Sequence, residues 1–142
     1  MQDFFFTYSG GTFQKILFGD VMYFEGKRNY VSLITETRTH ILPNGMNQLE
    51  VVLPSEFFCR IHKSYIVALD KIKSFDEERL LLCEPAKSRS DAVKPVCLRE
   101  LPLSKVFVTR LRKSILIIPA RQGISKNSLL QEVDGSTLVL EG

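Results

Sequence analysis

The first third of the chain consists of short apolar runs separated by turn sequences, and this pattern restricts the fold more than any other feature. Residues 4–8 and 12–18 flank Ser9-Gly10-Gly11, and Gly19-Asp20 precedes the apolar residues 21–24. Runs of about four to eight aromatic and β-branched residues between such turns are typical of strands, and short turns join antiparallel neighbours. Residues 21–24 are apolar throughout, which predicts a strand that is buried on both faces.

The β-pattern continues along the chain and is interrupted by a short helix. Asn44 is the candidate N-cap of this helix, Met46, Leu49 and Leu53 form one apolar stripe, and Pro54 ends it. The spacing of the stripe predicts about two helical turns. Further strands are expected at residues 29–35, 57–61, 65–69, 72–75, 80–83 and 96–101.

Basic residues are concentrated near the end of the chain, although the net charge is only +3. Several of these basic residues lie on a second helix, which is predicted from its N-cap Ser104 to residue 113. Residues 101–131 contain no acid. This asymmetry is consistent with an anionic partner such as nucleic acid, and also with an ordinary solvated face. The basic residues of this region are Lys105, Arg110, Arg112, Lys113, Arg121 and Lys126.

The length of 142 residues accommodates one compact domain and a short appendage. With 44% hydrophobic and 25% charged residues, the chain is expected to be globular. We expect a domain over residues 1–114 and an extension over residues 115–142, where Asp134-Gly135 predicts a β-hairpin at residues 128–140. No apolar stretch reaches the roughly 18 residues of a membrane span, and Asp3 does not fit a signal peptide, so a cytoplasmic location is expected.

The sequence contains no recognisable motif for catalysis or metal binding. Its three cysteines, Cys59, Cys83 and Cys97, form no CxxC pair, which predicts reduced structural side chains and no metal site. Ser64 lies near His62 but lacks the glycine-flanked turn that presents a serine nucleophile. No phosphate-binding loop, GxGxxG or HExxH motif is present. The sequence therefore predicts no enzymatic activity and no cofactor, and it favours a binding module.

The central segment places three hydrogen-bonding side chains between two apolar strands. His62, Lys63 and Ser64 separate residues 58–61 from residues 65–67, an arrangement typical of a turn that presents donors. In one interpretation, Ser64 satisfies local backbone groups and His62 is a fixed, partly buried side chain. In the other, Lys63 meets a phosphate or a guanine edge while His62 and Ser64 donate to DNA phosphates or bases.

Several other segments accompany this turn in a specific order and spacing. They are Gly-Asp-Val-Met-Tyr-Phe-Glu-Gly at 19–26, Asn-Tyr-Val at 29–31, the helix at 49–53, Phe-Cys-Arg-Ile-His-Lys-Ser-Tyr-Ile-Val at 58–67, Asp-Lys-Ile at 70–72 and Leu-Pro-Leu-Ser-Lys at 101–105. Together they resemble the LytTR-type DNA-binding domain, the output domain of many bacterial response regulators, from about residue 4 to residue 113. The resemblance implies a mostly β fold of small antiparallel sheets with two short helices. It also implies sequence-specific binding of double-stranded DNA by a bacterial transcriptional regulator.

The resemblance further implies that loops, and not a recognition helix, read the DNA. Three loops on one edge of the fold enter two successive major grooves and the minor groove between them, on repeated half-sites. The side chains that correspond to these loops are Lys27, Arg28, Asn29, His62, Lys63, Ser64, Ser104 and Lys105, while Arg60, Arg110, Arg112 and Lys113 are assigned either to phosphate contact or to solubility. The implied partners are double-stranded DNA, a second copy of the chain on DNA and a separate sensor or receiver protein, with no membrane.

The chain departs from the family pattern at two places, and one alternative function stays open. Ala68 stands where the family commonly has asparagine, and residues 84–94 form a longer connection than the usual tight turn. A receiver domain would need about 120 further residues, so we expect a stand-alone regulator or the output half of one. The alternative is a LytTR-like β-domain that does not bind DNA and acts in protein interaction or ligand sensing. Acidic or apolar residues in place of Arg28 and Lys63 would have favoured that alternative.

Overall fold

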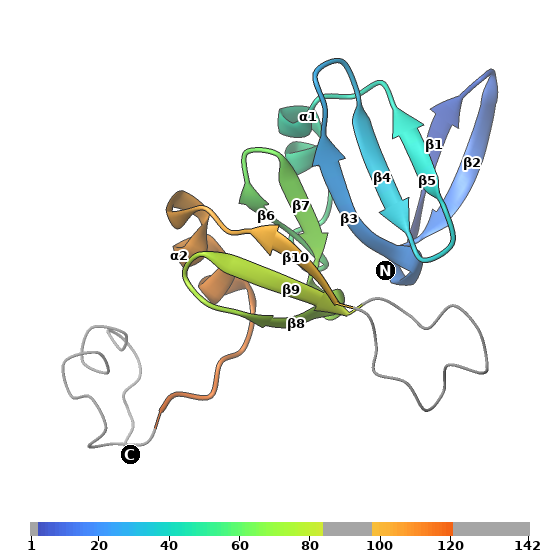
Figure 1. The fold of residues 1–142 in the computed structure, drawn as a ribbon. Coiled ribbons are helices and arrows are strands. Elements are labelled where there is room, and N and C mark those ends of the chain that lie inside the picture. The colour runs from blue at the N-terminus through green and yellow to red at the C-terminus, as the bar shows by residue number, and fades with distance from the viewer. Residues whose placement is uncertain (1–2, 84–97, 121–142) are drawn as a thin grey trace.

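The computed structural model describes residues 3–83 and 98–120, which form three antiparallel sheets and two α-helices (Figure 1). The central sheet has the strand order β5 (Thr39–Leu42), β4 (Val31–Thr35), β3 (Val21–Gly26), β7 (Tyr65–Ala68) and β6 (Phe58–His62). A hairpin of β1 (Phe4–Ser9) and β2 (Thr12–Leu17) forms the second sheet, and β10 (Leu98–Pro102), β9 (Arg79–Cys83) and β8 (Ile72–Phe75) form the third. The helices are α1 (Met46–Val52) and α2 (Lys105–Ser114). The predicted mostly β fold is confirmed.

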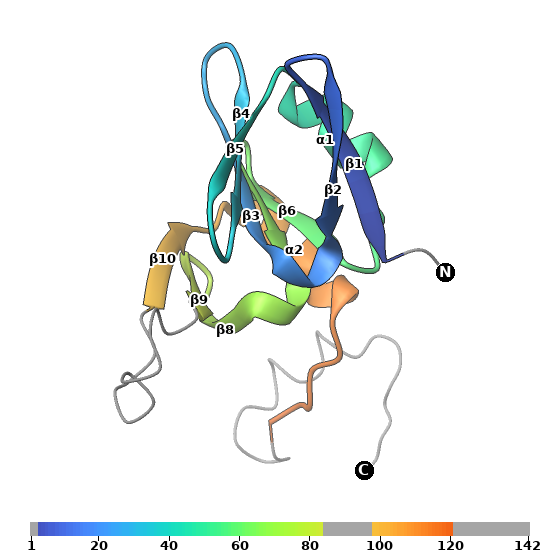
Figure 2. The same cartoon turned by 90° about the vertical axis from the view of Figure 1, so that its right-hand side faces the viewer.

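Two hydrophobic cores lie on opposite faces of the central sheet. Val21 and Phe24 of β3 belong to the core shared with α1 and the hairpin, whereas Met22 and Tyr23 belong to the core shared with β9, β10 and α2. Figure 2 separates the hairpin and α1 on one side of the sheet from β9 and β10 on the other. The predicted burial of β3 on both faces is therefore confirmed. A register shift between Val21 and Tyr23 explains why adjacent residues, and not alternate ones, share a face.

The tight turn predicted between the first two strands is present. Gly10 and Gly11 have φ angles of 60° and 82°, the left-handed values that a two-residue hairpin turn requires and that glycine adopts readily. The inner face of the hairpin buries Ile16, whereas Phe6, Tyr8 and Phe13 on its outer face are 54%, 55% and 69% exposed. The hairpin thus covers one core and leaves an aromatic face in solvent.

One local prediction is wrong, one holds without its expected hydrogen bond, and one strand was not predicted. Gly45, and not Asn44, is the N-cap of α1, because the Asn44 side-chain amide donates to Gln48 Oε1 at 3.1 Å instead of bonding to the helix backbone. Ser104 is the N-cap of α2 as predicted, but its hydroxyl forms no capping hydrogen bond. Strand β5 was not predicted, and it forms by pairing with β4.

Other predictions fall outside the described residues. These are the connection at residues 84–94, Cys97 and the C-terminal hairpin at residues 128–140. Within residues 3–83 and 98–120, no helix is long and apolar enough to cross a membrane.

Candidate nucleic-acid interface

Three connections between elements meet at one edge of the fold: the β3–β4 loop, the β6–β7 turn and the start of α2 (Figure 1). The Gly26 N–H donates to the Ser64 carbonyl at 2.8 Å, which joins the first connection to the second. The Ser104 N–H donates to the Ile61 carbonyl at 2.9 Å, which joins the second to the third. The structure thus brings together three loops that lie far apart in the sequence.

Gly26 allows the end of β3 to lie close to α1. A Cβ atom at this position would lie 2.7 Å from Met46 Cγ, which is shorter than real Cβ contacts. The absence of a side chain therefore lets the first loop leave the sheet beside the β6–β7 turn.

The β3–β4 loop exposes two side chains that can read bases. Arg28 and Asn29 are exposed and form no hydrogen bond or ion pair in the part of the chain that the structure describes. The Lys27 N–H donates to the Tyr30 carbonyl at 2.8 Å, which closes the loop. The Lys27 ammonium lies 3.3 Å from Glu25 Oε2 and is already paired. Arg28 and Asn29 are therefore the free members of this predicted set.

Glu25 adds a second link between the first two loops. Its Oε2 atom also accepts a hydrogen bond from the Tyr65 hydroxyl at 3.2 Å. Burial and the charge of Glu25 raise the pKa of Tyr65, so its hydroxyl stays protonated and donates. One carboxylate thereby holds Lys27 of the β3–β4 loop and the first residue of β7.

His62 braces the β6–β7 turn from within. The Ser64 N–H donates to His62 Nδ1 at 3.1 Å, so Nδ1 is the acceptor and the neutral imidazole carries its proton on Nε2. Burial, followed by the charges of Lys63 and Arg60, lowers the pKa of His62 and favours this neutral form. The imidazole also lies against the Tyr65 ring, with the centroids 5.7 Å apart. His62 is thus fixed by the turn, and its Nε2–H remains as a donor.

Lys63 and the start of α2 supply positive charge beside this turn. Lys63 and Lys105 are exposed, and neither ammonium forms an ion pair among the described residues. The first turn of a helix also carries backbone N–H groups that lack partners within the helix. In α2 the Phe107 N–H donates to the Ser104 carbonyl at 2.8 Å. The N–H groups of residues 105 and 106 lie before this bond and have no partner within the helix. This end of α2 is suited to an anion.

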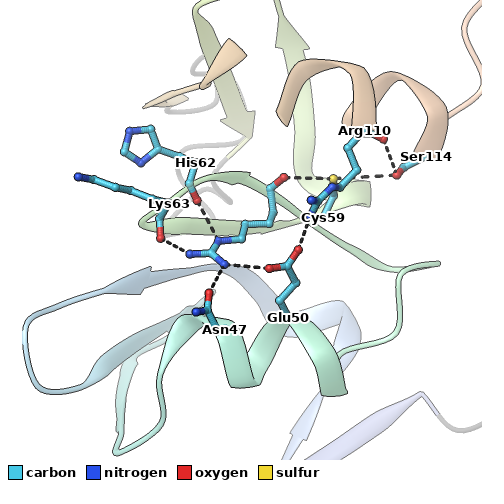
Figure 3. Close-up of polar contacts among 8 residues, drawn as sticks. Asn47, Glu50, Cys59, His62, Lys63, Arg110 and Ser114 are labelled. Carbon is cyan, nitrogen blue, oxygen red and sulfur yellow. Dashed lines mark hydrogen bonds and ion pairs between the residues drawn. The ribbon is translucent and has the colours of Figure 1, made fainter. Parts of the chain in front are cut away.

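Arg60 lies differently from the other predicted residues, because its guanidinium faces the protein. Its side chain is only 10% exposed. Nε donates to the His62 carbonyl at 3.3 Å, and Nη2 donates to the Lys63 carbonyl at 2.6 Å (Figure 3). Nη1 donates to Asn47 Oδ1 at 2.7 Å and to Glu50 Oε1 at 2.8 Å. The side chain expected on an open surface thus has most of its donors occupied inside the fold.

Glu50 connects Arg60 to the second helix. Its other oxygen, Oε2, accepts a hydrogen bond from Arg110 Nη1. The Arg110 guanidinium lies over the Phe107 ring, 4.9 Å from the centroid, and the Arg60 guanidinium lies 5.8 Å from the same ring. Hydrogen bonding to Arg60 is the largest cause that lowers the pKa of Glu50, so its carboxyl is ionised. The Arg60–Glu50–Arg110 network therefore joins α1, β6 and α2.

Sequence reasoning did not identify Asn47 and Glu50 as part of this edge. They are three residues apart on α1 and project from one face of the helix toward the Arg60 guanidinium. A polar i, i+3 pair on a short helix was the available signal, but its partner Arg60 could be recognised only in three dimensions.

A family model that matches most of the described fold shows to which family the chain belongs. Residues 11–116 match the family model of the LytTr DNA-binding domain. The chain belongs to the LytTR family. Members of this family are DNA-binding domains of transcriptional regulators and are not enzymes, so this LytTR domain is a DNA-binding module. The family predicted from the sequence is confirmed.

This LytTR domain also resembles a solved structure. That structure is the LytTr DNA-binding domain of a Bacillus cereus protein described as a methyl-accepting/DNA response regulator. The TM-score is 0.58 and the identity 21%, and the match covers 80% of this chain and 97% of that chain. At this identity the likeness supports the fold. Comparison with curated proteins found no match.

Proposed function

We propose that this LytTR domain reads specific double-stranded DNA with the three loops of its shared edge. Residues 27–29 and 62–64 enter adjacent major grooves of repeated half-sites, and residues 104–105 contact the intervening backbone. The observation that carries the proposal is the pair of backbone hydrogen bonds, Gly26 to Ser64 and Ser104 to Ile61, that place the three loops side by side. In this proposal, residues 1–114 are the DNA-binding unit and residues 115–142 are an extension.

Base reading is assigned to the side chains that are free to reach a groove. The Arg28 guanidinium can fork onto O6 and N7 of guanine, and the Asn29 amide can fork onto N6 and N7 of adenine. Lys63 can reach a guanine edge or a phosphate, and the His62 Nε2–H and the Ser64 hydroxyl can donate beside it. The neutral imidazole makes His62 a hydrogen-bond donor without a charge.

Phosphate contact is assigned to Lys105 and to the backbone N–H groups at the start of α2. Lys113, at the far end of the same helix, contributes attraction that does not depend on sequence. Such contacts fix the register of the loops on the duplex but carry no sequence information.

The proposal includes two copies of the chain on DNA with two half-sites, and a monomer when DNA is absent. The three exposed aromatic side chains of the hairpin would bury roughly 300–400 Å² per copy, given about 150–250 Å² for a whole aromatic side chain. A stable interface buries about 800 Å² per partner, so this face alone is too small to hold a dimer. A separate sensor or receiver protein is the proposed source of regulation.

The direct test is selection of a duplex from a random library with the full chain, followed by titration of the selected and the scrambled duplexes. We expect the selected duplex to bind at least about a thousandfold more tightly. Light scattering should show a monomer without DNA and two copies on a duplex with two half-sites. Equal affinity for both duplexes would contradict sequence-specific binding, and a tight dimer without DNA would contradict the monomer.

A further inference from the structure

One guanidinium fixes two consecutive residues of the β6–β7 turn. The carbonyls of His62 and Lys63 both accept hydrogen bonds from Arg60, at 3.3 and 2.6 Å. Because the guanidinium is planar, its Nε–H and Nη2–H groups donate from one edge with fixed geometry, and they set the orientation of both peptide groups at once. The direction in which Lys63 and Ser64 project therefore depends on the position of the Arg60 side chain.

Helix α1 holds that guanidinium in place. Asn47 Oδ1 and Glu50 Oε1 both accept from Nη1, at 2.7 and 2.8 Å, and Glu50 supplies the compensating charge. A guanidinium that is 10% exposed is unfavourable without a counter-charge, so loss of the Glu50 charge favours an Arg60 side chain that turns toward solvent. Such a movement would release both carbonyls of the turn.

The same carboxylate also restrains the third loop. Glu50 Oε2 accepts from Arg110, which packs on Phe107 in the first half of α2. The Ser104 N–H at the start of that helix bonds to the Ile61 carbonyl beside the turn at 2.9 Å. Glu50 thus lies where restraints on the second and third loops converge (Figure 3).

From this geometry we infer that Glu50 is a positioning residue for DNA recognition: an acidic side chain that specific binding requires because it holds Arg60 and Arg110. The inference rests on the proposed DNA-reading role of the turn. It also reverses the simplest electrostatic expectation, since a carboxylate near DNA repels phosphates and its removal should strengthen binding. Removal of the Glu50 charge should therefore weaken specific binding if Glu50 is a positioning residue, and strengthen it if the carboxylate only repels phosphates.

The test compares Glu50→Gln with Glu56→Gln, which changes the net charge equally. Glu56 is exposed and forms no hydrogen bond or ion pair among the described residues. Affinities of the full chain for the selected and scrambled duplexes are measured at one salt concentration. We expect Glu50→Gln to lower the ratio of specific to non-specific affinity by on the order of tenfold, the effect of misplacing one base contact. Glu56→Gln should leave the ratio unchanged and strengthen both affinities slightly.

A second variant guards against a general loss of structure. Arg60→Lys keeps the charge but removes the fork that binds two carbonyls, so it should lower the same ratio while non-specific binding is retained. A direct phosphate contact by Arg60 would instead be largely preserved by lysine. If the ratio of specific to non-specific affinity is unchanged in Arg60→Lys, the assigned role of Arg60 is wrong.

Amide exchange in the free protein separates failure of this inference from failure of the proposed function. We expect Glu50→Gln, but not Glu56→Gln, to accelerate exchange at Ser64 and Gly26, whose N–H groups are bonded within and to the turn. A wild-type chain without sequence preference would contradict the proposed function, and unchanged exchange would independently contradict the positioning role. The inference is overturned if Glu50→Gln raises both affinities as Glu56→Gln does.

Discussion

His62 Nδ1 accepts a hydrogen bond from the Ser64 N–H at 3.1 Å, so the imidazole closes the β6–β7 turn. The same side chain was expected to contact DNA. Nδ1 is bonded within the protein, and the Nε2–H group remains as a donor. The structural and the functional interpretations of this residue are therefore compatible, because they use different atoms. This division makes the stability of the turn dependent on the protonation of His62.

We expect His62 to stabilise the fold less as the pH falls. Its pKa in the folded protein lies below the ordinary value of 6.5, so the unfolded chain binds the proton first. The contribution is fully present above pH 6.5 and is lost as the pH falls through that value toward the lowered pKa. His62→Ala should therefore cost about 0.5–1.5 kcal/mol at pH 8, the net value of one hydrogen bond, and less at pH 5.5.

The measurement is urea unfolding at both pH values, made in a His40→Ala background. His40 also has a lowered pKa, caused by burial and by the charge of Arg38, and would add its own pH dependence. The quantity compared is the difference in the free energy of unfolding between the proteins with and without His62→Ala. If this difference is the same at pH 8 and pH 5.5, Nδ1 does not act as the acceptor.

Base-reading and phosphate-binding side chains should differ in their effect on specificity. Arg28→Ala and Lys63→Ala should each weaken binding to the selected duplex by about 1–3 kcal/mol and relax the sequence preference. Lys113→Ala should weaken binding to selected and scrambled duplexes alike, because its position at the far end of α2 suits backbone contact only. If Arg28→Ala and Lys63→Ala reduce both affinities equally, the assignment of the two loops to base reading is wrong.

DNA affinity should fall steeply with salt, because each phosphate contact releases counterions. A plot of log affinity against log salt concentration should lose about one unit of slope in Lys113→Ala or Lys105→Ala. Glu56→Gln serves as a control in which no phosphate contact is lost. Binding that does not depend on salt would argue against an interface built on Lys and Arg.

Gly26→Ala should destabilise the domain and weaken DNA binding together. The new methyl group would lie 2.7 Å from Met46 Cγ, so the Met46 side chain or the end of β3 must move, at a cost of about 1–3 kcal/mol. Movement of Gly26 also strains its 2.8 Å hydrogen bond to Ser64. Gly19→Ala is the matched control, because no atom lies within 4 Å of its Cβ position. Thermal melting and DNA titration of both variants test the prediction, and equal melting temperatures would refute it.

The sequence predicted those elements whose signals are local. The Gly10-Gly11 turn requires positive φ angles that favour glycine, and β3 is apolar on both faces, so each could be recognised without its neighbours. Strand β5 has no comparable signal. Its four residues include Thr39 and His40, and only pairing with β4 makes them a strand.

The sequence by itself determined the turns and strands other than β5, the LytTR family and the loops that carry Arg28 and Lys63. Tertiary structure alone decided that Arg60 faces inward and that Glu50 meets both Arg60 and Arg110, which lie 10 and 60 residues away along the chain. The reason is physical. Periodicity and turn chemistry act between near neighbours, whereas the burial of a charged pair depends on how a helix and a sheet edge pack against each other.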